Sequence, residues 1–348
     1  MAILFCIYAL LYVCSSKGIL IPPKDISVSA VFAFGDSYVD QGNNNYIVTL
    51  GKCNFPPYGK DFVGGKPTGR FSNGKTLADF LAEALGVKDY LPAYLDPLIQ
   101  DQDLLTGVSF ASGGSGYDPI TPKIASAIPL SVQIEKFKQY TEKLKMNIGE
   151  EVAKDIIKNS VFLVVASTND LLYSLPARSL EYDAISYDNM LVKLALNFVK
   201  EIHKLGAGRI AVFSAPPVGC LPALRTLAGS PLRKCVDREN KAAQLFNNML
   251  KQKLQSLTSS FAPSRVAFVD FYNPLISIIE NPYQYGLEVT DKGCCGTGEI
   301  EVVFLCNKLS PTCSNDSKFL FWDSIHLSEK GCSIFLDQIL PNLIKSLF

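Results

Sequence analysis

Short runs of consecutive apolar residues alternate along this chain with longer segments in which apolar residues recur every three or four positions. The runs have the length and continuity of strands that are buried on both faces. They cover residues 29–34, 107–111, 160–166, 209–213 and 265–270. The intervening periodicity predicts helices around residues 132–144, 190–202 and 245–257, and a last helix is expected at 329–340. This alternation predicts an α/β fold with a parallel sheet that helices cover on both faces.

Polar or glycine-rich turns follow three of the predicted strands. The turns are GDS at 35–37, SGG at 112–114 and ND at 169–170. Because ligands of such sheets bind outside the carboxyl ends of the strands, we expect the three turns to converge on one edge. Asp323 and His326 directly precede the last predicted helix and can be delivered to the same edge.

The chain contains only two histidines, and this limits how a serine could be activated. A serine nucleophile needs an imidazole to take its proton and a third group to orient that imidazole. His326 has a carboxylate, Asp323, three residues before it. His203 instead lies in the last turn of a predicted helix, where a polar side chain complements the helix dipole, so we expect a structural role for it. The sequence therefore predicts a triad of Ser37, Asp323 and His326.

Acyl transfer also needs hydrogen-bond donors that point at the developing oxyanion. The backbone N–H groups of Ser37 and Gly113 and the side-chain amide of Asn169 are the predicted donors. The GxSxG motif of the common serine-hydrolase fold is missing, which indicates a different Ser/His architecture. The chain also has no HExxH motif, and we expect neither a metal nor another cofactor.

Composition narrows the class of protein further. With 348 residues, of which 48% are hydrophobic, the chain can bury a large core, and we expect one domain over residues 19–348. Stretches rich in glycine, proline or cysteine near 51–70 and 283–318 are predicted to be loop insertions on it. The formal net charge is zero and no basic stripe is present, so nucleic acid is not an expected partner.

The amino-terminal residues resemble a targeting signal more than part of a core. Residues 2–14 are apolar and uncharged, and small or polar residues follow them. The segment is short for a membrane span, so we expect a signal peptide over residues 1–18 that is cleaved, and hence an extracellular protein. A retained anchor and a buried first element are the alternatives. Asn315-Asp316-Ser317 is an N-glycosylation sequon, which predicts a glycan on Asn315.

Eight cysteines remain after the predicted cleavage, an even number that suits an oxidising compartment. Sequence alone does not fix their pairing. The simplest expectation is local closure, of Cys220 with Cys235 and of Cys294 and Cys295 with Cys306 and Cys313. A zinc site on the last four is the alternative, although adjacent cysteines lack the usual two-residue ligand spacing.

Six motifs together resemble those of plant GDSL esterase/lipases of the SGNH hydrolase superfamily. They are FGDSYVDQGNNN at 34–45, NFPPYG at 54–59, GRFSNGK at 69–75, ASGGSG at 111–116, APPVGC at 215–220 and FWDSIH at 321–326. CCGTGEIEV at 294–302 and FLCN at 304–307 most resemble the extracellular-lipase subgroup associated with pollen and anther surfaces. The resemblance implies a flavodoxin-like three-layer α/β/α sandwich with a five-stranded parallel sheet and no metal. It also implies the same nucleophile, triad partners and oxyanion donors as the residue pattern: Ser37, Asp323, His326, Gly113 and Asn169.

The chain departs from the family pattern at a few positions. Ser109 stands where the family usually has asparagine, Ser167 where it has glycine, and Ser324 and Leu327 flank the histidine in place of glycine and proline. The expected function is a secreted esterase/lipase that hydrolyses acyl lipid esters through an acyl-enzyme on Ser37. Its expected partners are small-molecule or lipid esters, with peripheral contact to lipid surfaces; the sequence does not indicate an oligomeric state. Acyl transfer to an alcohol by the same triad, and a lipid-binding coat protein whose catalysis is weakened at Ser109 and Ser167, are the alternatives.

Overall fold

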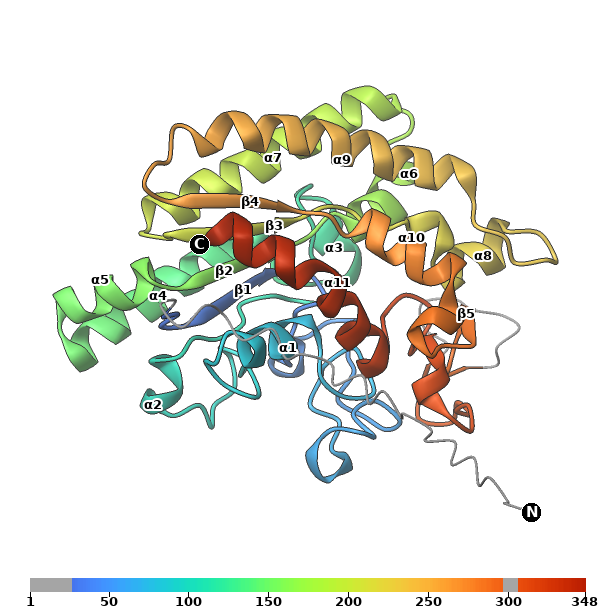
Figure 1. Cartoon of the computed structure of the whole chain (residues 1–348), viewed down its shortest axis with the longest axis horizontal. Coiled ribbons are helices and arrows are strands. Elements are labelled where there is room, and N and C mark those ends of the chain that lie inside the picture. The colour runs from blue at the N-terminus through green and yellow to red at the C-terminus, as the bar shows by residue number, and fades with distance from the viewer. Residues whose placement is uncertain (1–26, 297–305) are drawn as a thin grey trace, which may run out of the picture.

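A parallel sheet of four strands forms the centre of the molecule (Figure 1). The computed structural model describes residues 27–296 and 306–348, so the predicted signal peptide at 1–18 and part of the motif at 294–302 lie outside the described residues. The strands lie in the order β1-β2-β3-β4 and are β1 Val31–Gly35, β2 Val161–Val165, β3 Arg209–Phe213 and β4 Arg265–Val269. Four of the five predicted strands are therefore confirmed, with parallel register throughout.

The fifth predicted strand, 107–111, is an irregular edge segment. It runs beside β1 with backbone hydrogen bonds on both sides of one parallel bridge, between Ala33 and Ser109. The N–H of Gly35, which would extend the ladder, donates instead to Oε1 of Gln133 at 2.8 Å. The expected five-stranded sheet is thus four regular strands plus this partly paired segment.

Helices cover both faces of the sheet, which confirms the predicted three-layer α/β class (Figure 1). One layer contains α4 Leu130–Ile148, α7 Ala184–Lys204 and α9 Asp237–Thr258, and the other contains α1 Leu77–Ala84 and α11 Glu329–Leu347. The four predicted helices correspond to α4, α7, α9 and the first two thirds of α11. Shorter helices lie around these layers: α2 Asp101–Leu104, α3 Thr121–Ala125, α5 Glu150–Lys158, α6 Leu175–Ala177, α8 Pro222–Ala228 and α10 Tyr272–Glu280.

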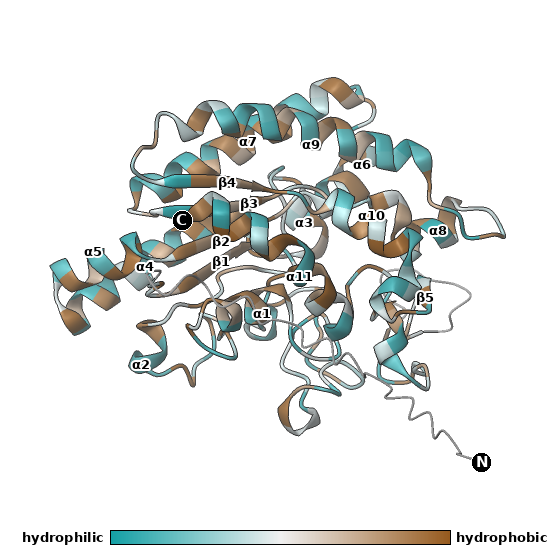
Figure 2. Cartoon of the chain, in the orientation of Figure 1, coloured by the Kyte–Doolittle hydropathy of each residue, from teal (hydrophilic) through white to brown (hydrophobic). Residues whose placement is uncertain are grey.

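Aromatic side chains fill the space between the sheet and α4. Phe32, Phe34 and Phe162 point from β1 and β2 toward Phe137 of α4, and all four are fully buried. The rings of Phe32 and Phe137 lie 5.4 Å apart, edge to face. Each such ring contributes roughly 1.5–3 kcal/mol by leaving water, so this layer explains why the predicted strands are continuous apolar runs. Figure 2 shows the same pattern, with brown strands between helices of mixed colour.

A second, two-stranded parallel sheet lies within the cysteine-rich stretch 283–318 and just after it. It pairs β5 Val289–Gly293 with β6 Phe319–Phe321. The backbone N–H groups of Cys294 and Cys295 donate to the carbonyls of Phe321 and Trp322, at 3.0 and 2.7 Å. This sheet therefore ties the stretch to the segment that carries the FWDSIH motif.

Three disulfides confirm the predicted local closure of the cysteines. They are Cys220–Cys235, Cys294–Cys313 and Cys295–Cys306. The last four cysteines bond to one another in pairs, which rules out the zinc alternative for them. Cys53 and Cys332 are buried and free. Among the described residues, no helix is both long and apolar enough to cross a bilayer.

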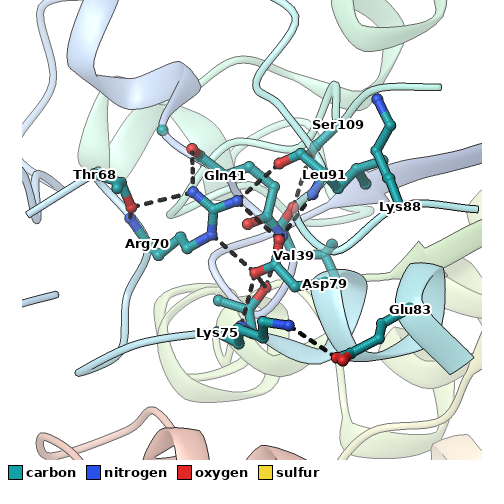
Figure 3. Close-up of polar contacts among 12 residues, drawn as sticks. Val39, Gln41, Thr68, Arg70, Lys75, Asp79, Glu83, Lys88, Leu91 and Ser109 are labelled. Carbon is teal, nitrogen blue, oxygen red and sulfur yellow. Dashed lines mark hydrogen bonds and ion pairs between the residues drawn. The ribbon is translucent and has the colours of Figure 1, made fainter. Parts of the chain in front are cut away.

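A buried ion pair fixes the loop that carries the GRFSNGK motif (Figure 3). Nε and Nη2 of Arg70 each lie 2.8 Å from a carboxylate oxygen of Asp79, in a two-pronged arrangement. Arg70 also donates to the carbonyls of Leu91 and Gln41. Asp79 in turn accepts the backbone N–H of Thr76 at the start of α1. The pair thus joins four segments of the chain around one guanidinium.

Candidate active site

Ser37 lies at the carboxyl edge of the sheet because β1 ends in a glycine. Gly35 has φ of 127°, and a Cβ on it would lie 1.7 Å from the carbonyl oxygen of Val165 in β2. Only glycine allows this close approach. The next N–H, of Asp36, donates to the same carbonyl at 2.8 Å, and the turn then presents Ser37.

Asp323 and His326 come from one tight turn between β6 and α11. Oδ1 of Asp323 accepts the backbone N–H groups of Ile325 and His326, at 2.8 and 2.7 Å. The imidazole Nδ1 lies 2.8 Å from Oδ2 and 2.9 Å from Oδ1 of the same carboxylate. The three-residue spacing seen in the sequence is therefore the spacing of an aspartate-capped turn. The structure brings this pair to Ser37, whose Oγ lies 2.7 Å from Nε2 of His326.

The three side chains are almost fully buried, with 6%, 3% and 8% exposed for Ser37, Asp323 and His326. Burial alone would raise the pKa of Asp323, but the His326 ring and two backbone N–H groups lower it below its ordinary value. The carboxylate is therefore ionised near neutral pH and can hold the imidazole in one tautomer. The rings of Phe71 and Tyr38 flank the imidazole, at 4.9 and 5.8 Å between centroids.

Ser37 and Asn169 offer free hydrogen-bond donors beside the serine oxygen. The Ser37 N–H has no partner among the residues that the structure describes. Asn169 donates one amide hydrogen to the carbonyl of Ser115, at 2.9 Å, which leaves its second amide hydrogen available. Both residues line the same cavity as His326.

Gly113, the third predicted donor, is engaged elsewhere. Its N–H donates to Oδ2 of Asp40 at 2.9 Å. The N–H of the next residue, Gly114, has no partner within the described part of the chain, and both glycines line the cavity. Gly114 has φ of 93°, a conformation that glycine favours. The sequence held one signal for this residue, the second glycine of the SGG turn.

Two buried carboxyls hold the loops of the site in place. Asp40 accepts backbone N–H groups from its own loop and from Gly113, and Asp170 accepts those of Tyr117 and Asp118. Burial raises the pKa of both Asp40 and Asp170 to about 6 in spite of these bonds. Sequence reasoning gave neither residue this role, since Gly113 lies 73 residues from Asp40, and Tyr117 and Asp118 lie 53 and 52 residues from Asp170. Within the described ranges, no three histidine, cysteine or acidic residues come together as metal ligands would.

Ser167 occupies a backbone conformation that suits glycine. Its φ is 108°, its side chain is fully buried, and its Oγ has no hydrogen-bond partner in the described structure. We expect Ser167→Gly to raise the free energy of unfolding by about 1 kcal/mol, because it removes the backbone strain and the unpaired hydroxyl. Denaturant unfolding measures the change.

Ser160→Gly is the matched control for this prediction. Ser160 is also buried, but it is not among the residues with positive φ, and its hydroxyl donates to a backbone carbonyl. Glycine there should destabilise the protein by about 0.5–1 kcal/mol. A loss of stability in both variants would contradict the strain at Ser167.

A cavity of about 130 Å³ opens directly onto the triad. Its polar lining consists of the groups described above, Thr121 and the hydroxyl of Tyr173, which has no hydrogen-bond partner in the described structure, and the rest is glycine or apolar. The apolar part is made by Leu50, Phe71, Ile124, Ala125, Ile325 and the ring of Tyr173. Such a pocket accepts a small apolar group next to the serine oxygen and the free N–H donors.

Comparison with known proteins gives one consistent result. Residues 31–339 match the family described as GDSL-like Lipase/Acylhydrolase. The Arabidopsis thaliana protein named GDSL esterase/lipase At5g42170 is 49% identical over 332 residues, which cover 95% of this chain and 90% of the relative. GDSL esterase/lipase EXL3 of the same plant is 47% identical, with 97% and 94% covered, and At3g14820 is 51% identical, with 92% of each chain covered.

Proposed function

The chain belongs to the plant GDSL esterase/lipase family and is a carboxylic ester hydrolase, and from this premise we propose that it works through an acyl-enzyme on Ser37. The observation that carries the proposal is the 2.7 Å contact between Oγ of Ser37 and Nε2 of His326. A serine hydroxyl in that contact can lose its proton as it attacks. His326 is oriented by Asp323 at 2.8 Å, so nucleophile, base and orienting group form one chain of hydrogen bonds.

In the proposed reaction, Oγ of Ser37 attacks the ester carbonyl carbon while Nε2 of His326 takes the hydroxyl proton. The bond to the alcohol oxygen then breaks, and His326 returns that proton to the leaving alcohol. In the second half, water attacks the carbonyl carbon of the acyl-serine while Nε2 of His326 takes a proton from it. The bond from that carbon to Oγ then breaks, His326 returns the proton to Oγ, and the carboxylic acid leaves. We assign the oxyanion donors to the N–H groups of Ser37 and Gly114 and the amide of Asn169, because the Gly113 N–H is bonded to Asp40.

Two departures from the family pattern leave this machinery in place, which favours catalysis over a lipid-binding coat protein. Ser109 donates to the carbonyl of Val39 at 2.6 Å and accepts the N–H of Ala111, so its hydroxyl is satisfied. Ser167 is strained, but Asn169, two residues on, still lines the cavity beside Ser37.

The size of the cavity predicts a preference for short acyl groups. A volume of 130 Å³ is roughly that of four water molecules, below the range of about 300–1,000 Å³ for sites that hold drug-sized ligands. We expect p-nitrophenyl acetate and butyrate to be hydrolysed at least about tenfold faster, in kcat/KM, than the palmitate ester. Initial rates over this series test both the esterase activity and the pocket.

A flat profile over the series would contradict the short-chain preference, and no hydrolysis of any member would contradict the proposed function. The same assay separates hydrolysis from acyl transfer when an alcohol is added. Hydrolysis gives free acid at the same yield, whereas a transferase gives the ester of the added alcohol.

The mouth of the cavity is apolar and suits esters that lie at a lipid surface. Leu50 and Ile124 line the cavity and are 66% and 45% exposed, and Val48 beside them is 94% exposed. We propose that the remainder of a lipid ester lies along this rim while its acyl end enters the pocket.

Secretion is the proposed setting for this chemistry. Three disulfides in the described residues suit an oxidising compartment, as does the predicted signal peptide at 1–18. Asn315 is exposed, and its Oδ1 accepts the N–H of Ser317. Its amide nitrogen is therefore open to the proposed glycan.

A further inference from the structure

The carboxylate of Asp323 has a side-chain partner that the sequence did not indicate. The hydroxyl of Tyr58 donates to Oδ2 of Asp323 at 2.8 Å, across 265 residues of chain. Both side chains are buried, with 4% and 3% exposed. Tyr58 belongs to the NFPPYG motif at 54–59, for which the fold and the triad gave no role.

The surroundings of Tyr58 keep its hydroxyl protonated and its ring in one orientation, so it remains a hydrogen-bond donor. Burial, followed by the negative charge of Asp323, raises the pKa of Tyr58 well above its ordinary value, so the hydroxyl keeps its proton. The ring lies edge-on to those of Phe55 and Trp322, with centroids 5.5 and 6.4 Å apart, which fixes its plane. The free, buried thiol of Cys53 packs in the same cluster beside it.

The contact matters because Nδ1 of His326 lies almost equally far from both carboxylate oxygens. Backbone N–H groups saturate Oδ1, and Tyr58 supplies the matching donor to Oδ2. With donors on both oxygens, the carboxylate cannot rotate about its bond without losing a hydrogen bond to an ionised group, and such bonds are the stronger ones. The imidazole then keeps the direction that places Nε2 on Ser37.

We propose that Tyr58 is a positioning residue, which acts on the reaction through Asp323 and never touches the substrate. The inference rests on the proposed function, because it assigns Tyr58 to the same triad. Tyr58→Phe removes only the hydroxyl, and we expect kcat for p-nitrophenyl acetate to fall about tenfold with KM unchanged. Since the Asp323–His326 pair binds a proton more readily when its carboxylate has one donor fewer, the acidic limb of the kcat/KM profile should move to higher pH.

Tyr140→Phe is the matched control. Tyr140 of α4 is fully buried in the aromatic layer between the sheet and α4, and its hydroxyl donates to the backbone carbonyl of Leu104. Removing this hydroxyl should lower the free energy of unfolding, as Tyr58→Phe does, but kcat and the pH profile should stay at the wild-type values. Rates are expressed per active site, titrated with a fluorophosphonate, so that unfolded protein does not enter the comparison.

A double-mutant cycle with Asp323→Asn separates positioning from a general structural effect. If Tyr58 acts through the carboxylate, Tyr58→Phe should cost about tenfold in the wild-type background and almost nothing in Asp323→Asn, measured as the rate of fluorophosphonate labelling. Equal losses in both backgrounds, or a wild-type kcat and pH profile in Tyr58→Phe, would overturn the inference. Fluorotyrosine at position 58 keeps the ring and is a stronger donor, so its acidic limb should move to lower pH even if Tyr58→Phe folds poorly.

Different results would refute the proposed function and the role of Tyr58. If wild-type protein and Ser37→Ala hydrolyse the ester at the same rate, the triad itself is refuted. If Ser37→Ala is inactive but Tyr58→Phe behaves as wild type, only the role of Tyr58 is lost.

Discussion

Ser37→Ala should lower kcat for p-nitrophenyl acetate by about 10⁴-fold or more, the scale seen when a serine hydrolase loses its nucleophile. The reason is geometric, since Oγ is the only atom of that side chain in contact with Nε2 of His326, and alanine removes it. No covalent intermediate can then form, and only His326, held by Asp323, and the oxyanion donors remain to assist a direct attack by water. Initial rates measure the loss, and fluorophosphonate labelling mapped to the peptide of Ser37 should disappear with it.

Ser324→Ala is the appropriate control for this loss. Ser324 is a buried serine of the turn that carries Asp323 and His326, but its hydroxyl makes no hydrogen bond to the proposed triad within the described structure. The variant should keep its activity within a few-fold of wild type and should still be labelled at Ser37. If Ser37→Ala hydrolysed the ester as fast as Ser324→Ala, the acyl-enzyme mechanism would be excluded.

The predicted triad was accessible from the sequence because its parts are local signals. Asp323 and His326 share one turn, and Ser37 follows a strand whose apolar run is unambiguous. The direction of a backbone N–H is not a local property. The N–H of Gly113 is not free to bind an oxyanion, because it donates to Asp40, which lies 73 residues earlier in the chain.

Long-range contacts also underlie the other differences between the predictions from sequence and the structure. Beside the irregular fifth strand, the N–H of Gly35 donates to Gln133, 98 residues away, and not to the neighbouring backbone. The even count of cysteines did not imply that all are bridged, since Cys53 and Cys332 are buried separately in two different clusters. The hydroxyl of Tyr58 meets Asp323 only once the whole chain has folded.

Arg70→Met should destabilise the protein by about 3–5 kcal/mol, the cost of leaving one member of a buried ion pair without its partner. Asp79 would lose both guanidinium bonds while its carboxylate stays fully buried, and the carbonyls of Leu91 and Gln41 would lose a donor (Figure 3). Denaturant unfolding measures the change. Lys138→Met, which breaks an exposed pair with Glu135 on α4, is the control and should cost less than about 1 kcal/mol.

The double variant Arg70→Met/Asp79→Leu decides what the ion pair contributes. If its main effect is the desolvation of two charges, removing both should recover most of the stability lost in Arg70→Met. The ion pair can also affect catalysis, because Phe71 follows Arg70 directly and packs against the ring of His326 at 4.9 Å. The activity of the double variant measures this second effect separately from stability. A double variant that is stable but slow would show that the pair holds the wall of the catalytic cleft in place, whereas one that is stable and fully active would limit the pair to folding. A single Arg70→Met variant within about 1 kcal/mol of wild type would contradict both roles.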